Sequence, residues 1–311
     1  MQVLKDGDAV SDALAGGVVA IGNFDGVHRG HRALLRRVAE LSASRKSSAG
    51  VMIFEPHPRQ LFRPDEEHFT LTPLPRKLER LEETGLDLAA VVAFNAALSK
   101  KSPEAFVQDL LVDWLQVSHA VIGYDFFFGY KRAGTPDTLK ALGLQHGFGV
   151  DVIAPQAEAG EVFSSSAIRA KLASGDVKGA GHDLGAPWQV TGKVVGGAQK
   201  GGPMGFPTAN VVMPRGTALG HGIFAVRVRH AGRTYDAAAY LGTRPTFDDG
   251  KPVLEVFLFD FSGDLYGQEI TVVFVEHIRP DRKFDSAEDL IAQMEIDCGN
   301  ARQILGEQGA G

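Results

Sequence analysis

Residues 18–31 read VVAIGNFDGVHRGH, a short apolar run followed by a turn that holds three glycines and two histidines. The apolar residues Val18–Ile21 have the length and the β-branched content of a buried strand. Further along, apolar residues recur at helical spacing, at Leu34, Leu35, Val38 and Leu41. This stretch therefore predicts a strand, a tight loop and a helix, which together form the first part of a βαβ unit.

Four more apolar runs of the same kind follow in the first half of the chain. They are Val51–Phe54, Ala89–Phe94, Ala120–Ile122 and Val150–Ile153. Segments with helical periodicity separate them, and one of these opens with an N-cap serine at Ser102, followed by Pro103 and Glu104. Strands that alternate with helices in this way predict an α/β domain built on a parallel sheet.

The second part of the chain consists of strands punctuated by glycine. The expected strands are Gln189–Val195, Gly222–Arg229, Thr234–Tyr240, Val253–Asp260 and Glu269–Val275. They predict a small antiparallel β-barrel, closed by a helix that starts at Ser286 with Asp289 three residues later. Small residues are frequent between Ser174 and Pro187, and we expect the domain boundary in this stretch. The two expected domains are residues 1–183 and 184–311.

The composition is that of an ordinary globular protein. The 311 residues suffice for two domains, and the net charge of -6 argues against nucleic acid as a partner. Cys298 is the single cysteine, which excludes an intramolecular disulfide and a multi-cysteine zinc site; helix packing is its expected role. We expect no membrane segment and a cytoplasmic location, and the sequence leaves a homo-oligomer open.

The turn GNFDGVHRGH carries the strongest chemical signal. Gly22, Gly26 and Gly30 let the backbone approach a ligand closely, and the helix N-terminus that follows offers N–H groups to phosphate. His28 and His31 can both point at a triphosphate and stabilise charge that develops on phosphorus. The alternatives are a surface or capping role and a fragment of a metal site. The spacings of the dinucleotide-binding and P-loop fingerprints do not occur at this turn.

Four ordered motifs resemble the HxGH nucleotidyltransferases, and among them the bacterial bifunctional riboflavin kinase/FAD synthetases. They are GNFDGVHRGH at 22–31, FEPHP at 54–58, GYDFFFG at 123–129 and SSSAIR at 164–169. The second half adds GFPTAN at 205–210, LGTRPTFDDG at 241–250, DLYG at 264–267 and RPDRKFDS at 279–286. The resemblance spans nearly the whole chain. It implies an enzyme that converts riboflavin and ATP to FMN and ADP, then FMN and ATP to FAD and pyrophosphate, with Mg²⁺ in both steps.

The resemblance also implies roles for residues of the first half. It makes His28 and His31 catalytic, and assigns ATP binding to Gly22, Asn23, Phe24, Gly26, His28, His31, Ser165, Ser166 and Arg169. The implied flavin-binding residues are Phe54, Pro56, His57, Pro58, Asp125, Phe126 and Phe128, joined by Arg282 from the second half. Asp125 is also expected near magnesium. For the SSSAIR segment, a capping serine with a solvated arginine is the alternative.

GFPTAN is similar to the riboflavin kinase signature, in which the threonine and the asparagine hold magnesium and nucleotide phosphate. Thr208 and Asn210 take these places here, and residues two apart on an extended segment point to the same side. ATP binding is further expected of Lys200 and Gly205 in the glycine-rich run before Thr208. The alternative for that run is a flexible hairpin loop.

Glu255 is the candidate catalytic base of the second half. It lies in the otherwise apolar segment VLEVFLFD, where an unpaired carboxylate is costly. Such surroundings suit a carboxylate to take a proton from an alcohol, and the family places its base at this position. The alternative is a glutamate paired with an arginine such as Arg244.

Some residues depart from the family pattern. Ala198, Lys200 and Gly202 replace charged residues of the glycine-rich loop, Tyr240 replaces an asparagine, and Phe257 replaces a histidine. One rival hypothesis is therefore an FAD synthetase whose barrel has become a flavin-binding regulatory module. Another is a nucleotidyltransferase that acts on pantetheine phosphate, nicotinate mononucleotide or a phosphoalcohol.

Overall fold

The computed structural model describes residues 1–196, 206–243 and 252–307. The chain divides into two compact units, Met1–Ser165 and Ser166–Gly311. A helix, α7 (Val177–Leu184), occupies most of the stretch in which small residues predicted the boundary. The expected division between residues 183 and 184 stays a prediction about the functional domains.

The first unit contains a six-stranded parallel sheet with the strand order β1-β4-β3-β2-β5-β6. Its strands are β1 (Gln2–Lys5), β2 (Val18–Ile21), β3 (Ala49–Glu55), β4 (Leu88–Ala93), β5 (His119–Gly123) and β6 (Gly149–Ile153). The five expected strands are all present, which confirms the α/β prediction. Strand β1 was not predicted, because only Leu4 among its four residues is buried and the segment shows no apolar pattern.

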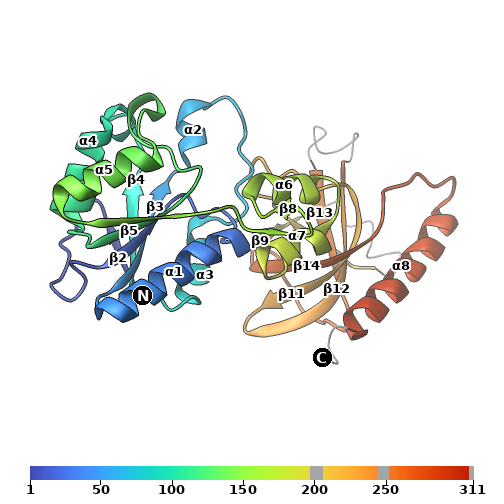
Figure 1. The fold of residues 1–311 in the computed structure, drawn as a ribbon. Helices are drawn as coiled ribbons and strands as arrows, with labels where there is room; N and C mark the ends of the chain where they lie inside the picture. The colour runs from blue at the N-terminus through green and yellow to red at the C-terminus, as the bar shows by residue number, and fades with distance from the viewer. Residues whose placement is uncertain (197–205, 244–251, 308–311) are drawn as a thin grey trace. The chain divides into compact units, whose positions relative to one another are not determined.

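Helices cover both faces of this sheet (Figure 1). They are α1 (Arg29–Arg45), α2 (Pro58–Phe62), α3 (Leu74–Glu82), α4 (Pro103–Phe106) with a π-helical continuation (Val107–Trp114), and α5 (Pro136–His146). Helices α1 and α3 pack on one face through Leu34, Val38 and Leu81. Helices α4 and α5 contribute Phe106 and Leu139 to the core on the other face. The sheet is therefore buried on both sides, as its continuous apolar strands require.

The strand order creates a topological switch point beside β2. Strands β3 and β4 lie on one side of β2, and β5 and β6 lie on the other. In open α/β sheets, ligands bind outside the carboxyl ends of the strands at such a point. The turn at 22–31 follows β2 and the turn at 123–129 follows β5, so the topology brings both motifs to the same edge of the sheet.

The second unit is a closed six-stranded antiparallel barrel, which confirms the predicted fold class. Its strands are β9 (Gln189–Val195), β10 (Ala209–Val211), β11 (Gly222–His230), β12 (Arg233–Thr243), β13 (Pro252–Leu258) and β14 (Glu269–Arg279). Strand β10 is only three residues long and was not predicted. Strand β13 ends two residues before the expected end at Asp260, whose φ of 54° lies in the left-handed region and interrupts the strand.

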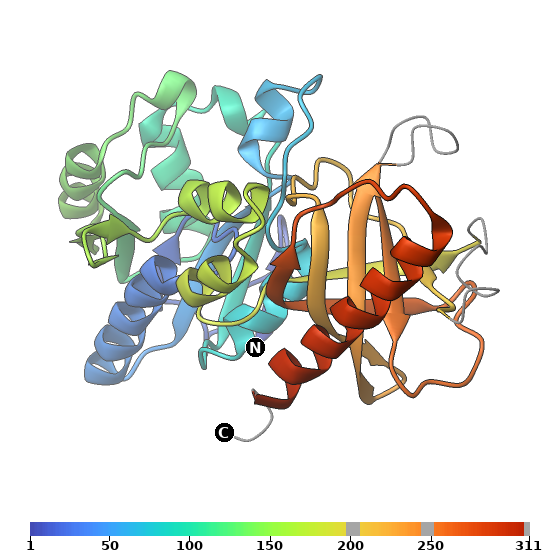
Figure 2. The ribbon, with the colours of Figure 1, turned by 90° about the vertical axis from the view of Figure 1, so that its right-hand side faces the viewer.

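Helices α6 (Ser165–Ala173), α7 and α8 (Ala287–Glu307) complete the second half, and α8 packs along β11, β12 and β14 (Figure 2). The predicted cap is confirmed, because the Asp289 N–H donates to the Ser286 hydroxyl at 3.0 Å. Ala301 and Leu305 are buried against the barrel, and Cys298 packs on the same cluster. Burial raises the pKa of the Cys298 thiol to about 11, so this cysteine serves helix packing, as expected.

A buried ion pair joins α8 to the end of β14. The Asp297 carboxylate, 4% exposed, accepts hydrogen bonds from Arg279 Nε at 2.9 Å and Nη2 at 2.7 Å, and from Gln293. Replacing Asp297 with alanine is expected to lower the free energy of unfolding by roughly 3–5 kcal/mol, because it leaves the guanidinium buried without its counter-charge. Urea unfolding followed by circular dichroism measures this loss. Arg302→Ala removes an exposed ion pair to Asp260 and a cation–π contact with Phe259, so it should lower the midpoint less than Asp297→Ala does.

Candidate active sites

The turn after β2 is anchored by the buried carboxylate of Asp25. This carboxylate accepts hydrogen bonds from the backbone N–H groups of Leu71 at 3.1 Å and Thr72 at 3.0 Å. The Gly26 N–H in turn donates to the Thr72 hydroxyl at 2.8 Å. Gly26 has a φ of 92°, which favours glycine at this position. The turn is thus held against the segment that leads into α3, a role of Asp25 that the sequence pattern did not indicate.

The two histidines of the turn stack at the N-terminus of α1. His28 is the N-cap residue, and its Nδ1 accepts a hydrogen bond from the His31 N–H at 3.2 Å. The two ring centroids are 3.6 Å apart, and the Phe24 ring lies 4.8 Å from that of His31. The Nδ1 atom of His31 and the Oδ1 atom of Asn23 are buried without a partner among the residues that the structure describes. The geometry leaves polar atoms unsatisfied at the place where the sequence predicts a ligand.

The environment keeps His31 neutral. Burial lowers its pKa well below the usual value, and the positive charges of His28 and Lys77 lower the pKa further. Near pH 7 the imidazole is therefore uncharged in the free protein. An approaching triphosphate would oppose this shift, because its negative charge favours the protonated ring.

Gly30 makes room for the His28 ring. A Cβ atom at this position would lie 3.0 Å from the His28 imidazole and 3.0 Å from the carbonyl oxygen of Phe163. Gly30→Ala is therefore expected to displace the ring. If the turn has the adenylyl-transfer role that the resemblance implies, the variant should lower FAD formation from FMN by about 100-fold, since small misplacements have effects of that size. Steady-state rates with supplied FMN measure this loss. FMN formation from riboflavin, which the resemblance assigns to the second half, should not change.

The SSSAIR segment leads into α6. The Ser165 hydroxyl donates to the backbone carbonyl of Asp25 at 2.8 Å, which ties the start of this helix to the turn after β2. Ser166 and Arg169 follow in the same helix and belong to the second unit.

The FEPHP segment joins β3 to α2. Phe54 is buried in the core, whereas Pro56 is exposed. His57 caps α2 and stacks on His68 with ring centroids 4.3 Å apart, and Pro58 is the first residue of the helix. The segment therefore presents a fixed loop at the carboxyl end of β3.

The three consecutive phenylalanines after β5 have different surroundings. Phe128 is 5% exposed and belongs to the core, and Phe126 is half-buried and stacks on it at 5.5 Å. Phe127 is 43% exposed, with the Arg132 guanidinium over its ring. Asp125 is exposed. The three rings therefore have different degrees of exposure and different partners.

Helix α3 carries two buried cationic side chains that were not predicted from the sequence. Lys77 is 1% exposed and Arg80 is 2% exposed, although both residue types are almost always solvated. Burial lowers the pKa of Arg80 to about 10, with further lowering by Arg32 and Arg76. The spacing in the sequence could have predicted that Lys77 is buried. Lys77 lies three residues after Leu74 and four before Leu81, on the buried stripe of this amphipathic helix.

The barrel brings the candidate base together with the GFPTAN segment. Asn210 on β10 and Tyr240 on β12 both lie directly opposite Glu255 on β13. The Thr208 hydroxyl donates to Glu255 Oε2 at 3.4 Å, and Asn210 is 6% exposed. The Tyr240 hydroxyl donates to Asp281 at 3.1 Å. The expected grouping of a threonine, an asparagine and a glutamate is therefore present in space.

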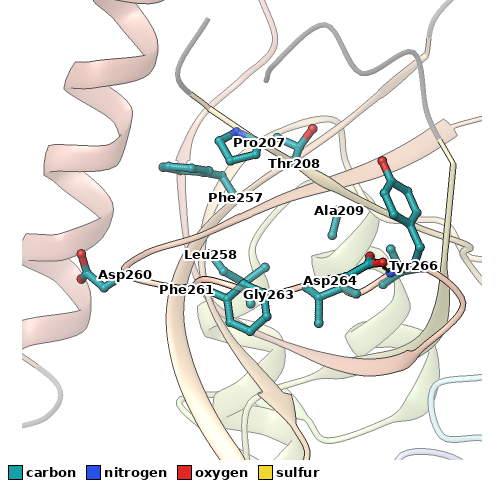
Figure 3. A pocket seen from close by; sticks show the side chains of 12 residues that line it. Pro207, Thr208, Ala209, Phe257, Leu258, Asp260, Phe261, Gly263, Asp264 and Tyr266 are labelled. Atoms are coloured by element: carbon teal, nitrogen blue, oxygen red, sulfur yellow. Dashed lines mark hydrogen bonds between the residues drawn. The ribbon is translucent and has the colours of Figure 1, made fainter. Parts of the chain in front are cut away.

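A cavity of about 380 Å³ lies beside this group (Figure 3). Its lining residues are Val194, Pro207, Thr208, Ala209, Phe257, Leu258, Asp260, Phe261, Gly263, Asp264, Leu265 and Tyr266. Pro207, Thr208 and Phe257 lie in the upper part of the view, and Phe261, Gly263 and Asp264 lie below them. Phe257 also packs edge-to-face on Phe206 at 5.2 Å. Phe257, the aromatic residue that departs from the family pattern, thus forms part of the cavity wall.

Other expected residues are not brought into these groups. Arg282 is exposed, donates to Gln293 at 2.7 Å, and lies over the Phe284 ring. Ala198, Lys200, Gly202, Gly205 and Arg244 lie outside the described residues. Over residues 1–196, 206–243 and 252–307, no cluster of three His, Cys, Asp or Glu side chains is placed to hold a metal ion.

Two family models match the chain, one in each half. The model described as FAD synthetase matches residues 10–167, and the model described as riboflavin kinase matches residues 184–305. The bifunctional riboflavin kinase/FMN adenylyltransferase of Escherichia coli K12 is 40% identical over 94% of this chain and 93% of that protein. The chain belongs to this family.

Other bifunctional riboflavin kinase/FMN adenylyltransferases are similarly close. That of Pseudomonas fluorescens is 39% identical over 93% of both chains, and that of Haemophilus influenzae is 35% identical over 98% of this chain and 99% of its own. A solved Streptococcus pneumoniae structure, titled a macrolide-efflux protein, is 28% identical with a TM-score of 0.86 over 96% of this chain and 98% of its own. The likeness to this solved structure therefore extends over both halves of the chain.

As a bifunctional riboflavin kinase/FMN adenylyltransferase, the protein phosphorylates riboflavin with ATP to give FMN and ADP, and adenylylates FMN with ATP to give FAD and pyrophosphate. The match of the riboflavin kinase model to residues 184–305 disfavours the rival hypothesis of a purely regulatory barrel. The match of the FAD synthetase model likewise disfavours other nucleotidyltransferase substrates. Within the described part of the chain, none of the helices combines the length and the apolar content needed to span a bilayer.

Proposed function

We propose that the two reactions occur at two separate sites, adenylyl transfer at the His28–His31 turn and phosphoryl transfer at Glu255 on the barrel. The observation that carries the first assignment is the stacked histidine pair at a helix N-terminus, beside the switch point of the sheet. The hydrogen bond between Thr208 and Glu255 supports the second. We place the functional division between residues 183 and 184, supported by the start of the riboflavin kinase match at residue 184.

At the first site, the phosphate oxygen of FMN attacks the α-phosphorus of ATP, and the bond to the leaving pyrophosphate breaks. His28 and His31 bind the phosphates and stabilise the charge that develops on them, because they lie at the positive end of the α1 dipole. The residues proposed to bind ATP are also Gly22, Asn23, Phe24, Gly26, Ser165, Ser166 and Arg169. The residues proposed to bind the flavin in the first half are Phe54, Pro56, His57, Pro58, Asp125, Phe126 and Phe128. Arg282 is the flavin-binding residue proposed for the second half.

At the second site, Glu255 accepts the proton of the ribityl hydroxyl as this oxygen attacks the γ-phosphorus of ATP, and ADP leaves. The Thr208 hydroxyl orients the carboxylate. Lys200, Gly205 and Thr208 bind the nucleotide in this proposal, and the cavity beside Thr208 has aromatic walls suited to a planar ring.

The proposed metal is Mg²⁺. The hydroxyl and amide oxygens of Thr208 and Asn210, and the carboxylate of Asp125 at the first site, are hard ligands that suit this ion. Magnesium usually takes few protein ligands and completes its shell with phosphates and water, so small donor sets fit it. When bound, the ion neutralises phosphate charge during transfer. The use of ATP supports a cytoplasmic location.

Incubation of the purified protein with riboflavin, ATP and Mg²⁺ tests the proposal, with flavins separated by chromatography. Both FMN and FAD should accumulate, and replacing Mg²⁺ with EDTA should stop both reactions. FAD formation that persists in EDTA would contradict the metal assignment. Unchanged riboflavin, with FAD formed only from supplied FMN, would contradict the kinase assignment.

A further inference from the structure

A lysine on α3 is buried with little compensation. Lys77 is 1% exposed, and among the described residues its ammonium hydrogen-bonds only to Glu55 Oε2, at 3.4 Å. The Glu55 side chain is 33% exposed. Burying a charged group is costly unless it is well paired, and one long bond to a partly solvated carboxylate is weak compensation. Two of the three donors of the ammonium are left for another acceptor.

The position of Lys77 coincides with the edge of the sheet that carries the histidine turn. Glu55 is the last residue of β3, the neighbour of β2. Helix α3 follows directly on Leu71 and Thr72, whose N–H groups bind Asp25 in the turn. Two independent contacts therefore place the first turn of α3 beside the turn at 22–31.

The electrostatics agree with this placement. The positive charge of Lys77 is one of the causes that lower the pKa of His31, after burial and His28. The buried atoms Asn23 Oδ1 and His31 Nδ1 have no partner among the described residues, so the histidine turn contains unsatisfied polar groups.

We propose that Lys77 is a further phosphate-binding residue of the adenylyl-transfer site, with its ammonium directed at the triphosphate of ATP. The inference rests on the site proposed above and extends it to a third element, α3. The triphosphate supplies the counter-charge that Glu55 provides only in part. The same positive charge would also favour departure of pyrophosphate, which carries away negative charge when the bond to the α-phosphorus breaks.

The competing explanation is structural, with Lys77 serving only to pair Glu55. Two substitutions separate these explanations. If the ion pair is what matters, Lys77→Met and Glu55→Gln should cause the same defect. If the ammonium acts on ATP, Lys77→Met should be defective, whereas Glu55→Gln should keep the charge and bind ATP at least as well. Lys77→Arg, which retains a positive charge, should restore part of the loss.

The experiment measures FAD formation with FMN at saturation and ATP varied, in the full-length chain. Lys77→Met is expected to raise the KM for ATP about 10- to 100-fold, the range for losing a hydrogen bond to a charged group. Lys140→Met, an exposed lysine on α5, is the matched control and should behave as wild type. Circular dichroism of the same preparations reports whether the chain is folded, because FMN formation on the barrel would report only the second unit.

An unchanged KM for ATP in Lys77→Met, or equal defects in Lys77→Met and Glu55→Gln, would overturn the inference. Failure of this inference is distinguishable from failure of the proposed adenylyl-transfer site. If only the role of Lys77 is wrong, His28→Ala still abolishes FAD formation. If the site itself is wrong, His28→Ala does not abolish it.

Discussion

FAD formation from FMN is expected to fall by about 1000-fold or more when His28 and His31 are both replaced with alanine. Each ring lies at the N-terminus of α1, where we propose that charge on the transferred phosphate develops. Loss of a single such donor typically costs about 100- to 1000-fold in rate. The single variants should each approach the double variant, because residues that act as one unit are not additive. Single-turnover assays with supplied FMN and ATP measure the chemical step.

The riboflavin kinase reaction of the same variants is a control. FMN formation from riboflavin should continue at the wild-type rate, since it is proposed to take place on the barrel. His146→Ala, at the last residue of α5, removes an imidazole of the same unit without touching the turn. FAD formation by the double variant at close to the wild-type rate would refute the assignment of the adenylyl-transfer site.

FMN formation is expected to fall by about 100- to 10,000-fold in Glu255→Gln, the range for loss of a general base. The amide of glutamine still accepts the hydrogen bond from Thr208, so the barrel should remain folded. Adenylylation of supplied FMN should be unaffected. Chromatography of flavins after incubation with riboflavin and ATP measures the loss.

Glu269→Gln is the matched control for this substitution, because Glu269 is an exposed glutamate on strand β14 of the same barrel. It should leave both reactions unchanged. If Glu255→Gln phosphorylates riboflavin as fast as wild type, Glu255 is not the base and its hydrogen bond with Thr208 has only a structural function.

The two departures from the family pattern that the structure describes are accommodated in the barrel. Tyr240, in place of an asparagine, lies opposite Glu255 and donates to Asp281, in the segment before α8. Phe257, in place of a histidine, packs on Phe206 and lines the cavity. Both replace a small or polar group with an aromatic ring that has its own partners, so neither leaves an unfilled position in the fold.

Much of the architecture could be predicted because its causes are local in the sequence. Short β-branched runs that alternate with amphipathic segments predicted five of the six strands of the sheet, and capping at Ser102 and Ser286 predicted where two helices begin. Glycines at the turn after β2 and histidines three residues apart predicted a phosphate site, and this pattern is also local in the sequence. Backbone preferences and side-chain periodicity act over a few residues, so a sequence displays them directly.

The tertiary structure alone decided which distant residues meet. Strand register placed Asn210 and Tyr240 opposite Glu255, packing of α3 buried Lys77 beside Glu55, and the contact of Asp25 with the segment before α3 fixed the histidine turn. These pairings join residues far apart in the chain, and their free energies depend on burial and on the exact register of neighbouring elements. Neither quantity can be read from a short stretch of sequence. The motifs therefore predicted which chemistry to expect, whereas only the fold showed which distant residues contact Glu255 and the histidine turn.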